Sequence, residues 1–349
     1  MHDPRSSSIS IILTGGTIGA VLLDHSTRVE AAGNDTLRTR IAALTSKQGF
    51  DVQFHQLLCK ASEDFDMPEW HAIASKVDEL INQGCKRFLI THGTDTLPFT
   101  ATMLQLLFAK RDISIALAAA FYPLADARSD AIPNLTAAMA LLTDAQFHAG
   151  VYVPFRGTGQ EVLLHHAMHV KQMAADAGGF DSFYGAAAGI YKELTGLSWA
   201  NQNVEEIKTD FKVPSQEAMV DATRHVYFLG TYPGLNLLPY HALARKNDIL
   251  LVIRNYHSGT ANSSDGHGSI AEFIKTFPES LVAFSPLPAA LVTKPYESTL
   301  NLMRMGAYMY RDLPVHKLYV LGLLGIANGL SPHAALAPAQ NWLLNSIAE

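Results

Sequence analysis

Short apolar runs alternate with helix-period segments along the first half of the chain. Four strands are predicted at residues 8–13, 52–58, 87–91 and 113–117, and helices at 36–48, 67–82, 97–108 and 134–147. The helix at 67–82 has the clearest signals, because Pro68 lies at its start and Gly84 follows its end. Strands that alternate with helices of this length are typical of βαβ units, so we predict an α/β fold with a parallel sheet.

A second, smaller α/β pattern follows after a polar segment. Strands are predicted at 225–229, 249–253 and 281–284, and helices at 239–246, at 269–276 and twice more towards the C-terminus. The segment before them, 201–212, is polar and has few apolar anchors. We therefore predict a larger N-terminal parallel-sheet domain and a smaller C-terminal α/β domain. Their expected bounds are 1–200 and 223–349, with a linker at 201–222.

Composition narrows the class of protein. Hydrophobic residues make up 48% of the 349 residues and charged ones 17%, which excludes a disordered chain. The net charge is −6 and no Lys/Arg run exists, so no nucleic-acid partner is predicted. The start has no apolar leader, and the most apolar stretch, 318–326, is too short to span a bilayer, so no membrane partner is predicted. We expect a cytoplasmic protein that keeps Cys59 and Cys85 as thiols.

Polar turns follow three of the predicted strands directly. They are residues 14–19, 62–64 and 91–96, and the first and third are rich in threonine and glycine. Ligands bind outside the carboxyl ends of the strands in a parallel sheet, so we expect the three turns to meet at one edge. Turn geometry and helix capping use the same residue types, which is the alternative for each turn taken alone.

The residue spacing in this chain does not match other known site motifs. The first turn lacks the second glycine of the G-x-G-x-x-G fingerprint, and the chain has no P-loop, no G-x-S-x-G elbow and no H-E-x-x-H motif. His165, His166 and His169 have the spacing of ligands on a helix, but no acidic or cysteine ligand lies in the same turn. We therefore predict a polar helix face there rather than a metal site.

The two threonine-glycine turns resemble the paired signatures of bacterial-type L-asparaginases and glutaminase-asparaginases. One signature is Thr14-Gly15-Gly16-Thr17-Ile18 and the other is His92-Gly93-Thr94-Asp95-Thr96. The family's spacing and segments are also matched at Ser62-Glu63-Asp64, Trp70, Asp130, Pro133-Asn134-Leu135 and Lys171, which stands eleven positions before Ser182.

This resemblance implies hydrolysis of the side-chain amide of L-asparagine or glutamine, without a cofactor or a metal. It makes Thr17 the nucleophile and Thr94 a second threonine that acts with Asp95 and Lys171. The substrate-binding residues that it implies are Gly16, Ser62, Glu63, Gly93, Thr94 and Asp95. A threonine hydroxyl needs a nearby base, which a lysine can be if burial lowers its pKa. Backbone N–H groups at the glycine turns can stabilise the oxyanion.

The chain departs from the family pattern in three segments. The family brings a loop tyrosine beside the nucleophile, but this chain has no tyrosine before Tyr122. The corresponding loop, 20–33, offers His25, Thr27, Arg28 and Glu30. The other two altered segments read Ala119-Ala120-Phe121-Tyr122-Pro123 and His257-Ser258-Gly259-Thr260.

Three functions therefore stay open. The first is an L-asparaginase-type amidohydrolase, the second is an asparaginase-like protein that binds an amino acid without turnover, and the third is a hydrolase of another amide. The resemblance also implies a homo-oligomer, a dimer or a tetramer, with the site near a subunit interface. The polar loop 259–268 either completes that site or is an ordinary flexible loop.

Overall fold

The chain divides into two compact units, Met1–Val213 and Pro214–Glu349. The computed structural model describes residues 8–46, 51–157, 159–171, 173–174, 178–183, 187–200, 207–287, 294–311 and 313–344. The division falls inside the segment 201–222 that the sequence predicts as a linker. Part of that segment is regular structure, because helix α5 spans Gln216–Ala222.

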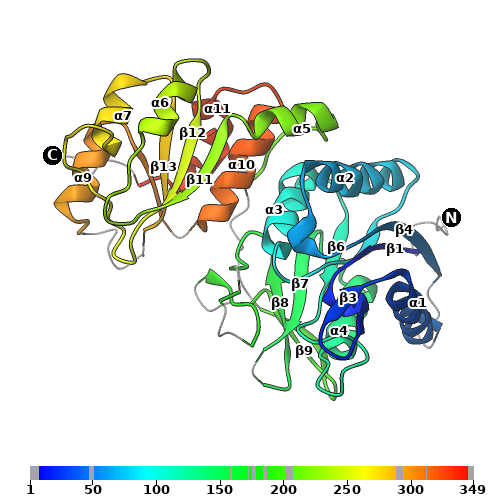
Figure 1. Cartoon of the computed structure of the whole chain (residues 1–349). Helices are drawn as coiled ribbons and strands as arrows, with labels where there is room; N and C mark the ends of the chain where they lie inside the picture. The colour runs from blue at the N-terminus through cyan, green and yellow to red at the C-terminus, as the bar shows by residue number, and fades with distance from the viewer. Residues whose placement is uncertain are drawn as a thin grey trace. The chain divides into compact units, whose positions relative to one another are not determined.

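An eight-stranded sheet forms the centre of the first unit (Figure 1). Its order is β10-β9-β8-β7-β6-β5-β1-β4. Neighbours from β7 to β4 pair in parallel: β7 (Gly150–Arg156), β6 (Ser114–Ala118), β5 (Arg87–Thr91), β1 (Ile9–Gly15) and β4 (Val52–Lys60). The remaining strands add antiparallel pairs: β8 (Val162–His166), β9 (Gly189–Lys192) and β10 (Gly196–Trp199).

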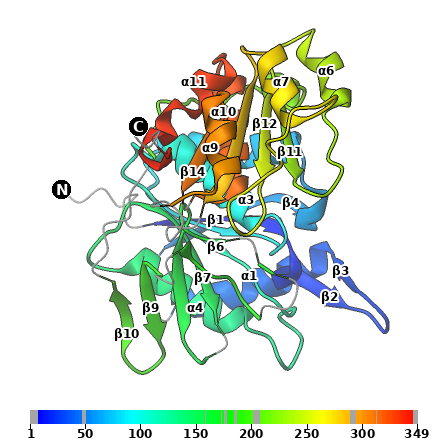
Figure 2. The ribbon, with the colours of Figure 1, turned by 90° about the vertical axis from the view of Figure 1, so that its left-hand side faces the viewer.

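Helices cover both faces of this sheet, as Figures 1 and 2 show. Helices α1 (Ala31–Ser46) and α4 (Ala131–Thr143) lie on one face, and α2 (Met67–Asn82) and α3 (Leu97–Phe108) lie on the other. Strand β1, which lies between β5 and β4, is buried along its whole length, as the apolar run in the sequence predicts. Helix α2 begins where predicted because Asp66 and Glu69 form a capping box at its first turn.

The second unit has a four-stranded parallel sheet of its own. Its order is β11 (Val226–Gly230), β12 (Leu250–Arg254), β13 (Leu281–Leu287) and β14 (Tyr308–Arg311). Its helices are α5, α6 (Leu238–Ala244), α7 (Ile270–Thr276), α9 (Glu297–Arg304), α10 (Val315–Ala327) and α11 (Pro332–Leu336). A large parallel-dominated sheet followed by a smaller parallel one confirms the predicted fold class.

The histidine cluster in the first unit corrects one prediction. His165 and His166 lie in strand β8, and His169 follows it in a turn, so the predicted helix is wrong. Adjacent residues of a strand point to opposite faces, which separates the first two imidazoles. Within the described ranges, no group of three or more His, Cys, Asp or Glu side chains is placed to hold a metal ion.

The apolar stretch 318–326 lies within helix α10, where most of its residues are buried. No helix in the described part of the chain is long and apolar enough to cross a membrane.

Candidate active site

The three polar turns meet at one edge of the large sheet. Strand β1 lies between β5 and β4, and all three run parallel, so their carboxyl ends are neighbours. A cavity of about 370 Å³ opens there. It is lined by Gly16, Thr17, Ala20, Thr27, Arg28, Val29, Cys59, Lys60, Ala61, Ser62, Glu63, Asp64, Gly93 and Asp95. Five of the predicted binding residues and the predicted nucleophile thus border one space.

Glycines allow these turns to touch through their backbones. A Cβ atom on Gly16 would lie 2.3 Å from the amide nitrogen of Gly93, and the φ of Gly16 is +83°. A Cβ atom on Gly93 would lie 2.5 Å from the Oγ of Ser62. No larger residue fits at either position without movement of a neighbour, so both glycines act as spacers between the strand ends.

Side-chain hydroxyls fasten the same turns to one another. The backbone N–H of Thr14 donates to Oγ1 of Thr91 at 3.0 Å, and the Thr14 hydroxyl donates to the Thr91 carbonyl. The hydroxyl of Thr96 donates to the carbonyl of Ser62 at 2.9 Å. The N–H of Gly16 donates to the carbonyl of Lys60 at 3.0 Å. The Gly16 N–H is thus used within the turn and is not a spare donor for a ligand.

Thr17 stands at the start of the short helix η2 (Thr17–Gly19), directly after β1. It is half-buried and borders the cavity. The chain then forms a hairpin of β2 (Ala20–Leu22) and β3 (Thr27–Val29), which projects from the unit in Figure 2. The loop 20–33 is therefore partly regular, and it supplies one wall of the cavity beside Thr17.

Acidic groups and one hydroxyl occupy the side of the cavity that β4 and β5 supply. Ser62 begins helix η3 (Ser62–Asp64) and is 1% exposed. Its Oγ has no hydrogen-bond partner among the described residues, and a buried hydroxyl of this kind gains from a polar ligand. Glu63 and Asp95 are exposed on the same side. An ammonium group fits this part of the cavity by charge.

Lys60 and Glu69 form an ion pair at the edge of the cavity. The hydrogen bond that the Lys60 ammonium donates to Glu69, with the charge of that carboxylate, raises the pKa of Lys60, so the ammonium is protonated at neutral pH. The Lys60 side chain is 45% exposed, which weakens the pair through solvent screening. Lys60 is therefore a cation of the site rather than a base.

His92 of the second signature supports the third turn from beneath. It is fully buried, its Nδ1 lies 2.7 Å from the Gly93 carbonyl and its Nε2 lies 2.9 Å from Oγ1 of Thr100. Burial lowers the pKa of His92 to about 4, which keeps the imidazole neutral. The ring is thus a neutral support for the Gly93 turn and not an acid or base near pH 7.

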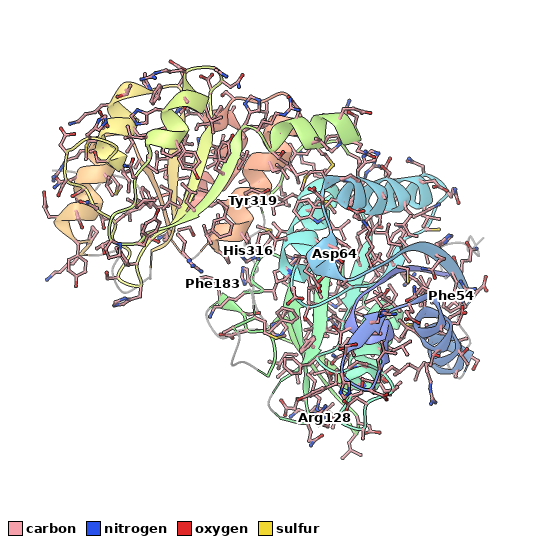
Figure 3. The ribbon with its side chains drawn as sticks, viewed as in Figure 1. Phe54, Asp64, Arg128, Phe183, His316 and Tyr319 are labelled. Atoms are coloured by element: carbon pink, nitrogen blue, oxygen red, sulfur yellow. The ribbon has the colours of Figure 1, made fainter. Side chains whose placement is uncertain are left out.

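Lys171 forms an ion pair with a residue of a neighbouring segment. Its Nζ atom is 2.9 Å from Oδ2 of Asp181 and 5.0 Å from the centre of the Phe183 ring. The bridge between Val170 and Ser182 brings these two segments together. Lys171 and Thr94 are not among the residues that line the cavity, and Figure 3 shows Phe183 apart from Asp64 of the cavity. The contact of Lys171 with Thr94 and Asp95 that the resemblance implies stays a prediction.

Asp130 and Asn134 organise the altered segment 119–123. The carboxylate of Asp130 accepts the N–H groups of Phe121 and Tyr122 at 2.9 to 3.2 Å. The Asn134 amide donates to the carbonyl of Ala119 and to Asp130, both at 2.9 Å. These two residues thus have a structural role after β6, where they hold the backbone of the altered segment.

Sequence reasoning missed several residues that border the cavity. Cys59 and Lys60 end strand β4, and Val29 packs against the Gly15 position from β3. Burial, followed by the nearby charge of Glu30, raises the pKa of the Cys59 thiol. Of the loop residues that the sequence offered, Thr27 and Arg28 line the cavity. His25 and Glu30 are not among its lining residues. The signal that could have found Cys59 and Lys60 is their position just before the Ser62 turn.

Comparison with known proteins decides the family. A family model described as "Asparaginase, N-terminal" matches residues 8–203, more than half of the chain. The chain belongs to the asparaginase family. The predicted family is confirmed, and with it the amidohydrolase class. The residues of both signatures lie within the matched range.

Curated relatives of the asparaginase-family chain carry two kinds of name. A glutamyl-tRNA(Gln) amidotransferase subunit from Pyrobaculum aerophilum is 32% identical over 123 residues, which are 35% of this chain and 30% of that protein. An L-asparaginase from Thermococcus kodakarensis is 26% identical over 145 residues, 42% of this chain and 43% of that protein. The chain spans less than half of the length of these two relatives.

Solved structures agree with the fold. The thermostable L-asparaginase from Thermococcus kodakarensis has a TM-score of 0.72 and 19% identity, over 98% of this chain and 99% of that one. A probable cytoplasmic L-asparaginase from Campylobacter jejuni has a TM-score of 0.73 and 22% identity, over 96% and 99%. At these identities the likeness establishes a shared architecture of both units.

Proposed function

We propose that this chain hydrolyses the side-chain amide of L-asparagine, with Thr17 as the nucleophile. The observation that carries the proposal is the meeting of Thr17, Ser62 and Asp95 around one cavity, from three separate strand ends. A hydroxyl nucleophile on one wall and acidic and hydroxyl groups on the other fit an α-amino acid whose side-chain amide faces Thr17. The family assignment supports the reaction class.

The proposed reaction has two steps that each break one bond of the acyl carbon. Oγ1 of Thr17 attacks the amide carbon, the C–N bond breaks, and the nitrogen leaves as ammonia with the proton that the hydroxyl releases. Water then attacks the Thr17 ester, which frees aspartate and restores the hydroxyl. A covalent intermediate of this kind divides a difficult hydrolysis into two easier steps.

The proposed proton acceptor for the Thr17 hydroxyl requires a side chain to move. Lys60 is held protonated by Glu69, and a guanidinium such as that of Arg28 has no acceptor for a proton. We propose, from the resemblance, that Thr94, Asp95 and Lys171 act together. Lys171 must then leave Asp181 and turn towards Thr94 when the substrate is bound. Catalytic hydrogen bonds often form only in the substrate complex, so the present ion pair does not exclude this role.

A second candidate function is hydrolysis of a different amide. Relatives named as an amidotransferase component match the chain, and no tyrosine is among the described residues that line the cavity. A third candidate, amino-acid binding without turnover, is favoured by the same lack of a tyrosine. The proposed cluster of Thr94, Asp95 and Lys171 opposes the third candidate, because binding alone does not need a lysine base.

Ammonia release separates these candidates. Purified protein is incubated with L-asparagine, L-glutamine and a panel of other primary amides, and Thr17→Ala serves as the control. Release from L-asparagine that disappears in Thr17→Ala supports the proposal. Release from another amide alone favours the second candidate. Tight binding of L-aspartate without any release favours the third.

We further propose a cytoplasmic homo-oligomer, either a dimer or a tetramer, in which the loop 259–268 of one protomer completes the site of another. Two free thiols, Cys59 and Cys85, fit a reducing compartment. Within its own unit the loop is anchored at its ends, because Thr299 donates to the carbonyl of Gly259 and Leu237 to that of Gly268. Native mass spectrometry tests the oligomer, and a fully active monomer would contradict it.

A further inference from the structure

The cavity beside Thr17 is divided by charge. Glu63, Asp64 and Asp95 lie on the side of β4 and β5, whereas Arg28 reaches the cavity from β3. Lys60, the other cation of the lining, is paired with Glu69. An ammonium group is thus favoured at one end of the cavity and an anion at the other.

Arg28 is only weakly held by other side chains of the described part of the chain. Its contact in the described ranges is with Glu30, at 3.4 Å from Nη1 to Oε1, and its side chain is 66% exposed. A guanidinium has five N–H donors in a fixed fork that matches a carboxylate, and one long contact leaves most of that capacity unused. The residue is therefore able to take an anionic group of a ligand.

Arg28 and the nucleophile border the same cavity. Arg28 pairs across the hairpin with Val21, which stands four residues after Thr17 in the sequence. When the α-amino acid end of a substrate lies by Ser62 and Asp95, the group that leaves the acyl carbon extends from Thr17 towards the hairpin. Arg28 then faces the leaving amine.

The size of the cavity permits a leaving amine larger than ammonia. About 370 Å³ falls in the range of about 300–1,000 Å³ that holds drug-sized ligands, and it exceeds what a free amino acid needs. The wall at that end includes Thr27, Arg28 and Cys59, and no apolar aromatic side chain is among the described lining residues. A small polar, negatively charged extension suits it.

We propose, on the basis of the proposed function, that Arg28 selects substrates whose leaving amine bears a carboxylate, namely β-aspartyl amino acids. The reaction is the same hydrolysis: Thr17 attacks the acyl carbon, the C–N bond of the secondary amide breaks, and the amino acid leaves after its nitrogen takes the proton. Water then releases aspartate from the Thr17 ester. Arg28 binds the carboxylate of the leaving amino acid and takes no part in the proton transfer.

Three substrates test this assignment with wild-type protein and Arg28→Gln. They are L-asparagine, β-aspartyl-glycine and N4-methyl-L-asparagine, which is a secondary amide without the extra carboxylate. Aspartate release is measured for each. The control is Arg111→Gln, because Arg111 is also exposed and forms one long ion pair, with Asp78 at 3.9 Å, before strand β6 at the other end of the sheet.

We expect Arg28→Gln to lower kcat/KM for β-aspartyl-glycine about tenfold, through KM, because an exposed charge-assisted hydrogen bond is lost. L-asparagine and N4-methyl-L-asparagine should change less than about twofold, and Arg111→Gln should change none of the three. Equal losses on all three substrates would overturn the assignment, since Arg28 would then serve the shared α-carboxylate or the hairpin itself. No loss on β-aspartyl-glycine would also overturn it.

Binding to Thr17→Ala separates this assignment from the proposed function. Dissociation constants of β-aspartyl-glycine and L-aspartate are measured by calorimetry for Thr17→Ala and for Thr17→Ala with Arg28→Gln. A loss of about tenfold confined to β-aspartyl-glycine supports the role of Arg28 even if no amide is hydrolysed by the wild type. Hydrolysis of L-asparagine without such a difference leaves the proposed function standing and removes the role of Arg28.

Discussion

Gly16 and Gly93 bring the ends of β1 and β5 into backbone contact, so that a Cβ atom on Gly16 would lie 2.3 Å from the Gly93 nitrogen. This contact sets the distance between the two threonine-glycine turns. Thr17 and Asp95, one residue and two residues further along, border the same cavity as a result.

Gly16→Ala should therefore disrupt both stability and the site. A positive φ costs about 1 kcal/mol for alanine, and the clash with backbone atoms adds more, so we expect a loss above about 3 kcal/mol. Gly84→Ala is the matched control, because its φ is +94° and nothing lies within 4 Å of the new methyl group. Urea denaturation measures both. Equal losses in the two variants would show that the contact with Gly93 has no energetic weight.

Two buried histidines should make the first unit sensitive to acid. Burial lowers the pKa of His92 and of His165 to about 4 each. An unfolded histidine titrates near its usual pKa of about 6.5, so the unfolded state binds more protons between about pH 6.5 and pH 4. Stability is fully present above this window and falls as the pH drops through it.

Each histidine should remove about 2 kcal/mol of unfolding free energy between about pH 8 and pH 5. Urea denaturation at a series of pH values measures the effect. His165→Gln is the informative variant, because His165 lies in β8 with its Nδ1 at 2.7 Å from the Ser182 hydroxyl, outside the cavity lining. Its slope of stability against pH should be shallower than that of the wild type. An unchanged slope would mean that the pKa of His165 does not differ between the folded and the unfolded protein.

Lys171 and Thr94 should lose activity as a coupled pair if Lys171 acts as proposed. Lys171→Met is expected to lower the rate about 10²- to 10⁴-fold, the usual contribution of an acid–base group. Thr94→Val combined with Lys171→Met should cost less than the sum of the single losses. Ammonia release measures all three variants, and additive losses would contradict the coupling.

Asp181→Asn distinguishes a catalytic from a structural lysine. It removes the partner that Lys171 has in the structure and leaves the lysine itself in place. If Lys171 is needed at Thr94, Asp181→Asn should keep most of the activity, since an exposed ion pair contributes about 0–1 kcal/mol. A loss as large as that of Lys171→Met would show that the ion pair, and not a base, is what activity requires.

Local sequence patterns were enough to predict the strands and helices of the parallel core of the first unit. Helix α2, strand β5 and helix α3 have the predicted bounds. A capping box begins α2, and a proline stands in the first turn of both helices. Convergence of the three turns followed from the parallel order of strands. These features depend on neighbours in the chain and on the general geometry of parallel sheets.

Features that depend on distant pairing could not be predicted. His165 and His166 have helical spacing with His169, yet pairing with β7 and β9 makes the segment a strand. The short hairpin of β2 and β3 has too few residues for any period to be visible. The bridge between Val170 and Ser182 brings Asp181 beside Lys171, and no local sequence pattern predicts this bridge.

The segment 20–33 holds the residues that could take the place of the family's loop tyrosine, and only some of them line the cavity. His25 and Glu30 do not line the cavity, so their replacement by alanine should leave hydrolysis of L-asparagine within about twofold of wild type. Without general-base help from the hairpin, we expect wild-type turnover on L-asparagine below about 10 s⁻¹, the middle of the usual range of enzymes. Steady-state ammonia release measures both quantities. A faster wild type would show that the loop tyrosine is dispensable in this chain.

Ammonia release from L-asparagine by wild type and Thr17→Ala, at matched concentrations and with equal circular dichroism spectra, tests the central proposal most directly. We predict measurable release by the wild type and a loss of at least about 10³-fold in Thr17→Ala, because the covalent path needs that hydroxyl. A folded Thr17→Ala protein that releases ammonia at the wild-type rate would contradict the assignment of Thr17 as the nucleophile.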